Sequence, residues 1–311
     1  MALIVVAGGV GGIVWVKRAN VDPRAVYANG LVAAERRDWE TLDRCLEELD
    51  QVPDFEPHRH ILQGFRELAN QRTDQALIAF SKGQSNPDTR EESYLQAGTV
   101  CYGLKEYREA IHLLQQVVDW NPDRLEAHRM LAAVQYDIGA MDQAMDALQN
   151  VIRLAPGDHR PHYMQGCILQ DYEQFQQAAA VFEEAANLAD EGTEEDAEIR
   201  VSWSECLLRL GRYAEALDAL QPAGDSANVL LCRAEAHYYL RQFDKARELV
   251  ETVLPLKPDD VDVITVAVRV FEQARDYDRG IDLVQAALER EPMNIRLLSS
   301  AADVYGAAGQ L

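Results

Sequence analysis

The sequence has little positive charge and few cysteines. Lys and Arg number 30 against 52 Asp and Glu, so the formal net charge is −22. Nucleic-acid binding needs a basic face that displaces counterions, and this composition argues against that function. The five cysteines are odd in number and form no CxxC pair, which indicates neither a disulfide framework nor a zinc site. We therefore expect single buried thiols in a reducing compartment.

Catalytic motifs are also missing. The chain contains no GxxxxGK[ST] phosphate loop, no GxSxG nucleophile turn and no HExxH metal motif. His159 and His162 have a spacing that a helical metal site would allow, but no third ligand is indicated, and packing histidines are favoured. We predict no catalytic residue, no metal and no cofactor. The acidic segment 190–196 lacks the alternating spacing of a calcium loop and is expected to be a solvated loop.

What the sequence does contain is a repeat. Segments 91–124 and 125–158 are consecutive stretches of 34 residues that align Ala110 with Ala144 and Pro122 with Pro156. Each has two apolar periodic runs separated by a short break. A fixed period of this length is typical of a solenoid, in which each unit buries its core against its neighbours. The predicted fold class is all-α, an α-solenoid of antiparallel helix pairs.

The same period extends over most of the chain. One position of the repeat, which we call the Ala slot, contains a small residue in most units. It is occupied by Leu42, Ala76, Ala110, Ala144 and Ala178 at intervals of 34 residues, then by Ala216 after 38, Ala246 after 30 and Gly280 after 34. The predicted units are 23–56, 57–90, 91–124, 125–158, 159–196, 197–226, 227–260 and 261–294, with a final half unit at 295–311.

Small residues and prolines fit this frame. Gly64, Gly98 and Gly166 are expected to let the two helices of a unit approach closely. Gly139, Gly211 and Gly309 are expected in left-handed turns inside units, which glycine adopts without steric cost. Pro222 and Gly224 are expected to shorten the second helix of the sixth unit.

With this period and its Gly, Ala and Pro slots, the chain resembles a tetratricopeptide repeat (TPR) protein over residues 23–311. The stretch LGRYAEALDAL, Leu210 to Leu220, is close to the usual family text, whereas no unit has Trp in the first aromatic slot. The resemblance implies about eight TPR-like units and a concave protein-binding surface lined by the first helix of each unit.

The resemblance also implies ligand-facing slots at positions 2, 5, 9, 12 and 13 of each unit. The candidate peptide-binding residues are Ile61, Phe65, Leu95, Tyr102, Arg129, Tyr136, Arg160, Tyr163 and Tyr238, and the same slots hold Gln170, Asp171, Leu231, Glu235 and Tyr239. Arg129 and Arg160 are expected to receive a carboxylate. The alternative is that several of these tyrosines pack between helices. The slot-9 Asn with which some family members hold a chaperone C-terminus is absent, so that role is not carried over.

An apolar run precedes the repeats. Residues 2–16 carry no charge and are followed by Lys17 and Arg18. As a helix they span about 22 Å, short of the roughly 30 Å hydrocarbon core, a gap that bilayer thinning or snorkelling closes. Residues 1–18 are therefore predicted to form an apolar helix that anchors the chain in a membrane, and 19–22 a linker. The anchoring side chains are Leu3, Ile4, Val5, Val6, Val10, Ile13, Val14 and Trp15.

Topology and function follow from these readings. The basic residues after the apolar run place the repeats on the cytoplasmic side of a single-pass protein. If the run is a signal sequence instead, the repeats are exported or periplasmic.

We expect a non-catalytic scaffold that binds a protein or peptide in its groove. The alternatives are a self-assembling, homo-oligomeric subunit of a membrane-associated complex, joined through the Gly8–Gly12 pair or the last half unit, and, more remotely, an enzyme subunit.

Overall fold

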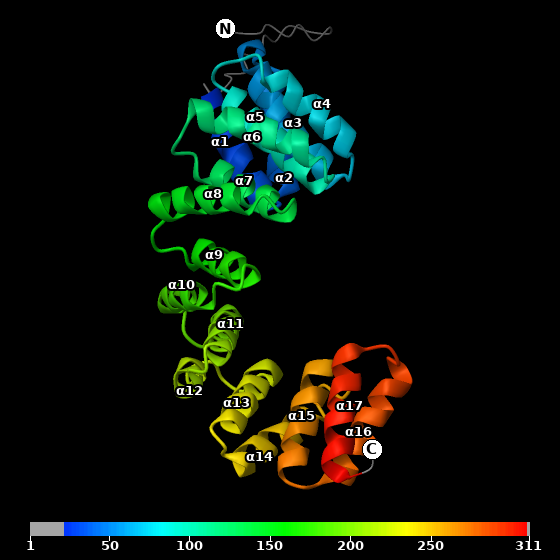
Figure 1. Ribbon diagram of the computed structural model, residues 1–311. Helices are drawn as coiled ribbons and strands as arrows, with labels where there is room; N and C mark the ends of the chain where they lie inside the picture. Colours follow the sequence, from blue (N-terminus) through cyan, green and yellow to red (C-terminus); the bar gives the residue numbers. More distant parts are fainter. Residues whose placement is uncertain (1–21, 310–311) are drawn as a thin grey trace, which may run out of the picture. The chain divides into compact units, whose positions relative to one another are not determined.

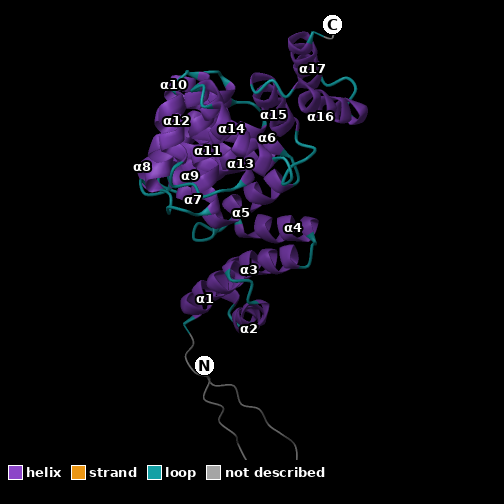
Figure 2. Cartoon of the chain, turned by 90° about the horizontal axis from the view of Figure 1, so that it is seen from below, coloured by secondary structure: helices purple, strands orange, loops and turns teal. Residues whose placement is uncertain are grey.

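The computed structural model describes residues 22–309, which are helical throughout and contain no strand (Figures 1 and 2). The predicted membrane anchor, residues 1–18, lies outside this range. The chain divides into two compact units, one ending at Ala147 and one beginning at Leu148, so the boundary falls within α8. Within residues 22–309, no helix is long and apolar enough to cross a bilayer.

The first unit holds seven complete helices, a short 3-10 helix η1 and the start of α8. They are α1 Pro23–Glu35, α2 Trp39–Asp50, η1 Pro53–Phe55, α3 Glu56–Ala69, α4 Thr73–Gly83, α5 Arg90–Gly103, α6 Tyr107–Trp120, α7 Leu125–Asp137 and α8 Met141–Leu154. The second unit continues with α9 His159–Asp171, α10 Phe175–Leu188, α11 Glu194–Arg209, α12 Tyr213–Leu220, α13 Ala227–Tyr239, α14 Phe243–Val253, α15 Val261–Gln273, α16 Tyr277–Arg290 and α17 Ile295–Ala308.

Polar side chains cap the first helix of several repeats. Asp158 accepts a hydrogen bond from the backbone N–H of Arg160, and Ser226 accepts one from Val229. Asp260 accepts from two backbone N–H groups at the start of α15. Such caps satisfy amides that have no partner inside the helix, which is why these helices begin where they do.

A left-handed residue follows the first helix of each repeat. Gly139 and Gly211, with φ of 76° and 74°, lie between the two helices of their repeats as predicted, and Gly309, with φ of 71°, ends α17 in the same left-handed conformation. The equivalent positions elsewhere hold residues other than glycine with φ between 57° and 62°: Arg37, Gln71, Lys105, Glu173, Arg241 and Arg275. These nine positions are separated by the same intervals as the repeated alanines. The left-handed backbone conformation is therefore kept in every repeat, although the residue type at this position varies.

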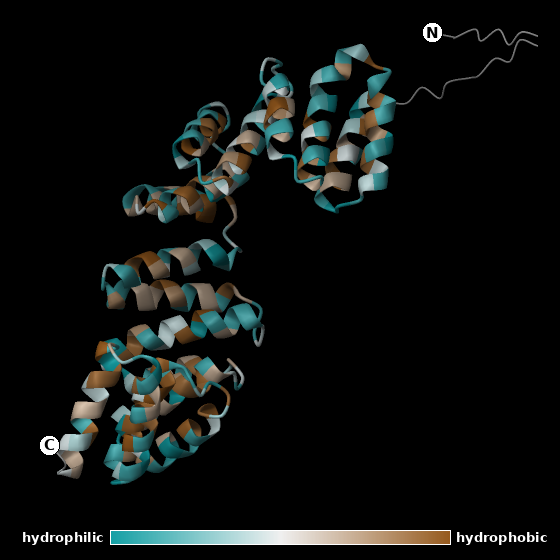
Figure 3. Cartoon of the chain, turned by 90° about the vertical axis from the view of Figure 1, so that its right-hand side faces the viewer, coloured by the Kyte–Doolittle hydropathy of each residue, from teal (hydrophilic) through white to brown (hydrophobic). Residues whose placement is uncertain are grey.

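The small slots are the points of closest helix approach. The residues at the repeated small-residue position are fully buried: Leu42, Ala76, Ala110, Ala144, Ala178, Ala216 and Ala246. A methyl group added at Gly64 would lie 2.3 Å from Phe80 Cε1, and one at Gly166 would lie 2.5 Å from Phe182 Cε1. The predicted close approach is therefore confirmed. Hydrophobic and hydrophilic residues alternate along many of the helices, as an amphipathic array requires (Figure 3).

The first helices of the second unit form a continuous row. α9 packs on α11, α11 on α13, α13 on α15 and α15 on α17, while the first four of these helices also pack on the second helix of their own repeat. The eight-residue α12 ends at Leu220, before Pro222, as predicted. This row provides the surface on which the candidate site is built.

The acidic segment 190–196 is not simply a solvated loop, which corrects the expectation. Thr193 caps α11, and Glu194 and Asp196 lie in its first turn. Asp196 is fully buried, accepts from the backbone N–H of Gly192 at 2.9 Å and pairs with Arg200 Nε at 2.7 Å. Arg200 in turn donates to the carbonyl of Ala219 at 3.1 Å. A buried ion pair within α11 therefore anchors the segment, and the Arg200 hydrogen bond to Ala219 links it to α12.

Candidate protein-binding groove

A groove of about 760 Å³ lies along the row of first helices in the second unit. α11 contributes Val201, Glu205, Leu208 and Arg209; α13 contributes Asn228, Leu231, Cys232, Glu235 and Tyr239; α15 contributes Asp262, Val266 and Arg269. Gln170, Asp171, Glu173 and Phe175 border one side, and Lys257, Asp260 and Arg296 the other. Along each helix the contributors recur every three or four residues, with adjacent pairs at 208–209 and 231–232, so they lie on one broad face of each helix.

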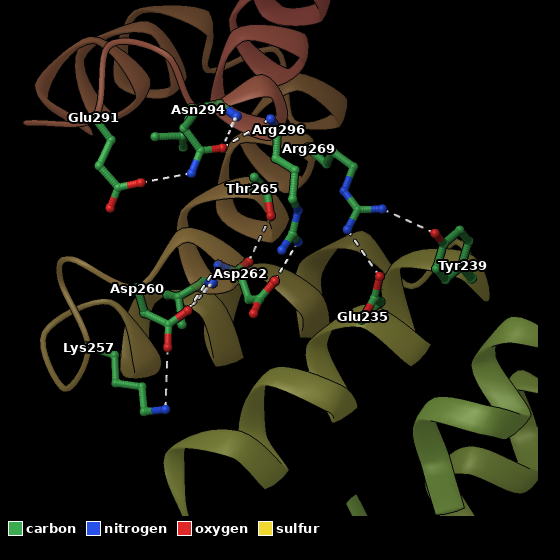
Figure 4. A network of polar contacts seen from close by, with 12 residues as sticks. Glu235, Tyr239, Lys257, Asp260, Asp262, Thr265, Arg269, Glu291, Asn294 and Arg296 are labelled. Atoms are coloured by element: carbon green, nitrogen blue, oxygen red, sulfur yellow. Dashed lines mark hydrogen bonds and ion pairs between the residues drawn. The ribbon is translucent and has the colours of Figure 1, made fainter. Parts of the chain in front are cut away.

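An aromatic and cationic cluster forms one wall of the groove. Tyr239 is 39% exposed and stacks on Tyr213, with ring centroids 4.8 Å apart and an interplanar angle of 10°. Arg269 donates to Tyr239 Oη at 3.1 Å and to Glu235 Oε1 at 3.0 Å (Figure 4). Burial opposes the charge of Arg269, but Glu235 and Tyr239 outweigh it and raise the pKa of the guanidinium. These contacts hold both side chains in place before any ligand arrives.

Two further cations of the groove have carboxylate partners. Lys257 Nζ lies 3.4 Å from Asp260 Oδ2 and donates to Asn228 Oδ1 at 2.7 Å. Arg296 pairs with Asp262, and Thr265 on the same turn donates to the Asp262 carbonyl at 3.0 Å (Figure 4). The α15 side of the groove is thus polar but internally neutralised.

Glu205 differs from these carboxylates. Its only hydrogen bond in the described part of the chain comes from Gln170 Nε2, at 3.4 Å to Glu205 Oε2. Glu205 is exposed on α11, but partial desolvation by the neighbouring helices raises its pKa, the Gln170 bond opposes this shift, and the charges of Glu235 and Asp262 add to it. Its carboxylate therefore faces solvent in the groove with two like charges nearby.

A second hollow of about 640 Å³ adjoins the groove. It shares Val201, Asn228 and Lys257 with the groove and adds Tyr163, Thr193, Glu194, Glu198, Ser202 and Ser226. The surface available to a ligand therefore continues along α11 toward its N-terminus.

In the first unit, the structure corrects two predicted ligand-facing residues. Ile61 and Leu95 are 0% and 3% exposed and belong to the core. Phe65 is half-buried with its ring edge on Phe80, at a centroid distance of 5.6 Å. Slot 5 is therefore closed to a ligand in the second and third repeats.

The other candidates of the first unit remain partly accessible. Tyr102 is half-buried and donates to Asp137 Oδ2 at 2.8 Å. Desolvation and this contact with Asp137 raise the pKa of Tyr102 to about 12. Arg129 and Tyr136 are half-buried on α7.

In the second unit, three predicted residues lie around the groove rather than in it. Arg160 is exposed and donates to both carboxylate oxygens of its cap residue Asp158, at 2.8 and 2.9 Å. Tyr163 packs on Phe182 at 5.7 Å and borders the second hollow. Tyr238 packs between Phe243 and Arg269, while its neighbour Tyr239 lines the groove.

The sequence interpretation found part of the groove and missed the rest. Gln170, Asp171, Leu231, Glu235 and Tyr239 were ligand-facing slots of the fifth and seventh repeats, and all five line it. The contributors from the sixth and eighth repeats were missed. The same slots, counted from 197 and 261, contain Val201, Glu205, Leu208, Arg209, Asp262 and Arg269.

The histidine pair has ordinary polar partners. His159 Nε2 lies 3.1 Å from Glu195 Oε2, and His162 Nδ1 lies 3.3 Å from Glu184 Oε2. Within residues 22–309, no group of three or more His, Cys, Asp or Glu is placed to hold a metal ion. The five thiols are free, and four of them are buried.

Solved structures share this architecture. YrrB, described as a TPR protein with an unusual peptide-binding site, is 19% identical with a TM-score of 0.51, and the match covers 60% of this chain and 96% of that one. PilF of Pseudomonas aeruginosa is 16% identical with a TM-score of 0.55, over 68% of this chain and 97% of that one. PilW, a type IV pilus biogenesis factor, is 13% identical with a TM-score of 0.54, over 67% and 97%. At these identities the likeness shows the fold alone.

Sequence comparison identifies the family. No curated protein matches the chain. Two models described as tetratricopeptide repeat match it, one over residues 102–166 and the other over 163–227 and 231–292, together more than half of its length. Proteins built from this repeat generally mediate protein–protein interactions and are typically non-catalytic scaffolds. The chain belongs to the tetratricopeptide repeat family.

Proposed function

We propose that this chain is a non-catalytic scaffold that binds a segment of a partner protein in the groove formed by α9, α11, α13 and α15. The groove itself is the observation that carries the proposal. Its volume lies in the range of sites that hold peptide side chains or small ligands. It also combines apolar contributors with a fixed Tyr239–Arg269 pair, and Tyr and Arg are the residue types that most often anchor protein interfaces.

Affinity capture with groove variants tests this proposal. Full-length protein and a Tyr239→Ala variant are used as bait in extracts of the source organism. Tyr172→Ala is the matched control, because Tyr172 is 53% exposed but does not line the groove. A partner retained by the parent and by Tyr172→Ala, and lost by Tyr239→Ala, is the expected result. Equal retention by all three proteins would refute the groove assignment.

The accessible candidates of the first unit form a second, separate part of the proposal. Tyr102 and Tyr136 offer phenol groups on α5 and α7, and Arg129 offers a cation on α7. Replacing these three residues together by Ala, with helicity checked by circular dichroism, is expected to weaken binding of the partner. Unchanged binding would remove them from the site and leave the groove as the only binding surface proposed.

We also propose that the scaffold is tethered to a membrane through residues 2–16. The uncharged run followed by Lys17 and Arg18 supports this proposal. The full chain is expected to stay with membranes after alkaline extraction, and a variant starting at residue 19 to be released. A protease added outside the membrane is expected to leave the repeats intact if they are cytoplasmic, and to degrade them if they are exported.

Self-assembly is the second candidate function, favoured by apolar residues near the last helix. Met293, Ile295 and Leu298 are 85%, 81% and 44% exposed, although α17 buries its other face on α15 and α16. Sedimentation of the full chain in detergent over a wide concentration range tests it. A mass that rises with concentration, and that Ile295→Glu returns to the monomer value, would support assembly through α17. A constant monomer mass would refute it.

A further inference from the structure

We infer that the groove selects a segment carrying Lys or Arg, whose cation is received by the Glu205 carboxylate between α9 and α13. The inference rests on the proposed binding function and adds the chemistry of the ligand to it. The charges lining the groove, their internal pairing and the surroundings of Glu205 each support it.

Carboxylates outnumber cations in the groove. Six acidic side chains line it, Asp171, Glu173, Glu205, Glu235, Asp260 and Asp262, against the four basic side chains Arg209, Lys257, Arg269 and Arg296. The adjoining hollow adds Glu194 and Glu198 and no further cation beyond Lys257. A ligand that enters this surface meets a negative potential, which favours a positively charged segment and repels an acidic one.

Ion pairs within the groove confine its excess of negative charge to one side. Arg269 pairs with Glu235, Lys257 with Asp260 and Arg296 with Asp262, so the α15 side is compensated. In the described part of the chain, no Lys or Arg forms an ion pair with Asp171, Glu173 or Glu205. These three carboxylates lie on the α9 and α11 side.

Arg209, the remaining cation of this side, is directed toward an aromatic ring. Its guanidinium carbon lies 5.3 Å from the ring centroid of Phe175. One cation therefore faces three carboxylates on this side, and the excess of negative charge is available to a ligand.

Glu205 is the member of this group best placed to receive a cation. It lies on α11, in contact with Gln170 of α9, and the carboxylates of Glu235 on α13 and Asp262 on α15 act on it from the other side. Glu205 is exposed to an incoming ligand, and a bound ammonium or guanidinium group would offset the repulsion that it experiences from Glu235 and Asp262. Leu231 and Val201 lie three or four residues from polar contributors on the same helix faces and offer apolar contact to the stem of the same side chain.

The test uses short random peptides displayed for selection on the full-length protein, with EDTA present so that no divalent cation takes the place of the ligand. Each enriched peptide is made again with its Lys or Arg replaced by Gln, and both versions are titrated against the parent and Glu205→Gln. Glu289→Gln is the matched control, since Glu289 is exposed on α16 and outside the groove. Circular dichroism confirms folding of each variant.

The expected result is enrichment of peptides with Lys or Arg. Replacing the cation by Gln, or Glu205 by Gln, should each weaken binding by about tenfold, the size expected for a charge-assisted hydrogen bond. The two changes together should cost little more than either alone, and Glu289→Gln should have no effect.

Other outcomes separate the failure of this inference from the failure of the proposed function. One such outcome is a peptide whose binding is weakened by Tyr239→Ala but unchanged by Glu205→Gln and by replacing its own Lys or Arg with Gln. This result would overturn the selection of a positive charge and leave the groove as a binding site. Peptides indifferent to both Tyr239→Ala and Glu205→Gln, or no enriched peptide at all, would overturn both.

Discussion

The tight glycine slots give a prediction whose magnitude follows from the geometry. In Gly64→Ala, the added methyl carbon would lie 2.3, 2.6 and 2.7 Å from three ring carbons of Phe80. Phe80 is fully buried, and its ring also meets the edge of Phe65, so the ring cannot swing into solvent. The helices must move apart, or the ring must leave its preferred rotamer.

Overpacking of this kind costs about 3 kcal/mol, the upper end of its usual range, because three atoms clash and the obstacle is a rigid ring. Alanine recovers about 1 kcal/mol through its higher helix propensity. The expected net effect of Gly64→Ala is a loss of about 2 kcal/mol. Gly98→Ala meets Leu114 Cγ at 2.9 Å, a flexible branched side chain, and is expected to be near neutral.

Gly103→Ala is the control in the same compact unit. It lies at the end of α5 with nothing within 4 Å of the added methyl, so it should gain about 0.5 kcal/mol. Urea denaturation followed by circular dichroism measures all three variants. The predicted order of stability is Gly103→Ala, then Gly98→Ala, then Gly64→Ala; a Gly64→Ala protein as stable as Gly103→Ala would refute the close helix approach.

Three further predictions use the same assay. Lys105→Gly should gain about 0.5 kcal/mol, because a left-handed φ of 62° strains any residue with a Cβ, while Gly211→Ala should lose about 1 kcal/mol; opposite signs would contradict the turn assignment. Asp196→Ala should lose about 3 kcal/mol by leaving the Arg200 cation without its buried partner, and a loss below about 1 kcal/mol would show that the pair is solvated. Glu205→Gln should stabilise the protein slightly at pH 7: partial desolvation and the charges of Glu235 and Asp262 raise the pKa of Glu205 in the folded state, so its ionised form costs some stability at neutral pH, although solvent screens this exposed side chain; the advantage should vanish as the pH falls below about 4.5.

The 34-residue period of the sequence predicted the helix pairs and their closest contacts. A small residue is needed wherever two helices cross closely, and its recurrence at a fixed interval can be recognised without knowing the rest of the fold. Gly139, Gly211 and Gly309 marked three of the turns for the same reason. The six other turns could not be read from sequence, since Arg37 or Lys105 is no more typical of a left-handed turn than of a helix end. Their conformation is imposed by the packing of the two flanking helices.

The site was less predictable because exposure of a slot depends on neighbouring helices. Slot 5 is buried at Ile61 and Leu95, yet it faces the groove at Val201 and Leu231. Nothing in the four side chains themselves distinguishes these two cases. The acidic segment misled for a related reason: Asp196 lies in a run of surface-type residues, but Arg200, one turn later, supplies the partner that allows it to be buried.

Site-specific photocrosslinking in living cells shows whether the groove contacts a partner protein. A photoreactive amino acid is placed at position 239, in the groove, or at position 289, on the exposed face of α16, in the full-length protein. We expect one dominant adduct at position 239 that is absent at position 289, and we expect the crosslinked segment of the partner to contain Lys or Arg. The same adduct at both positions, or an adduct at 289 alone, would contradict the assignment of the groove as the binding surface.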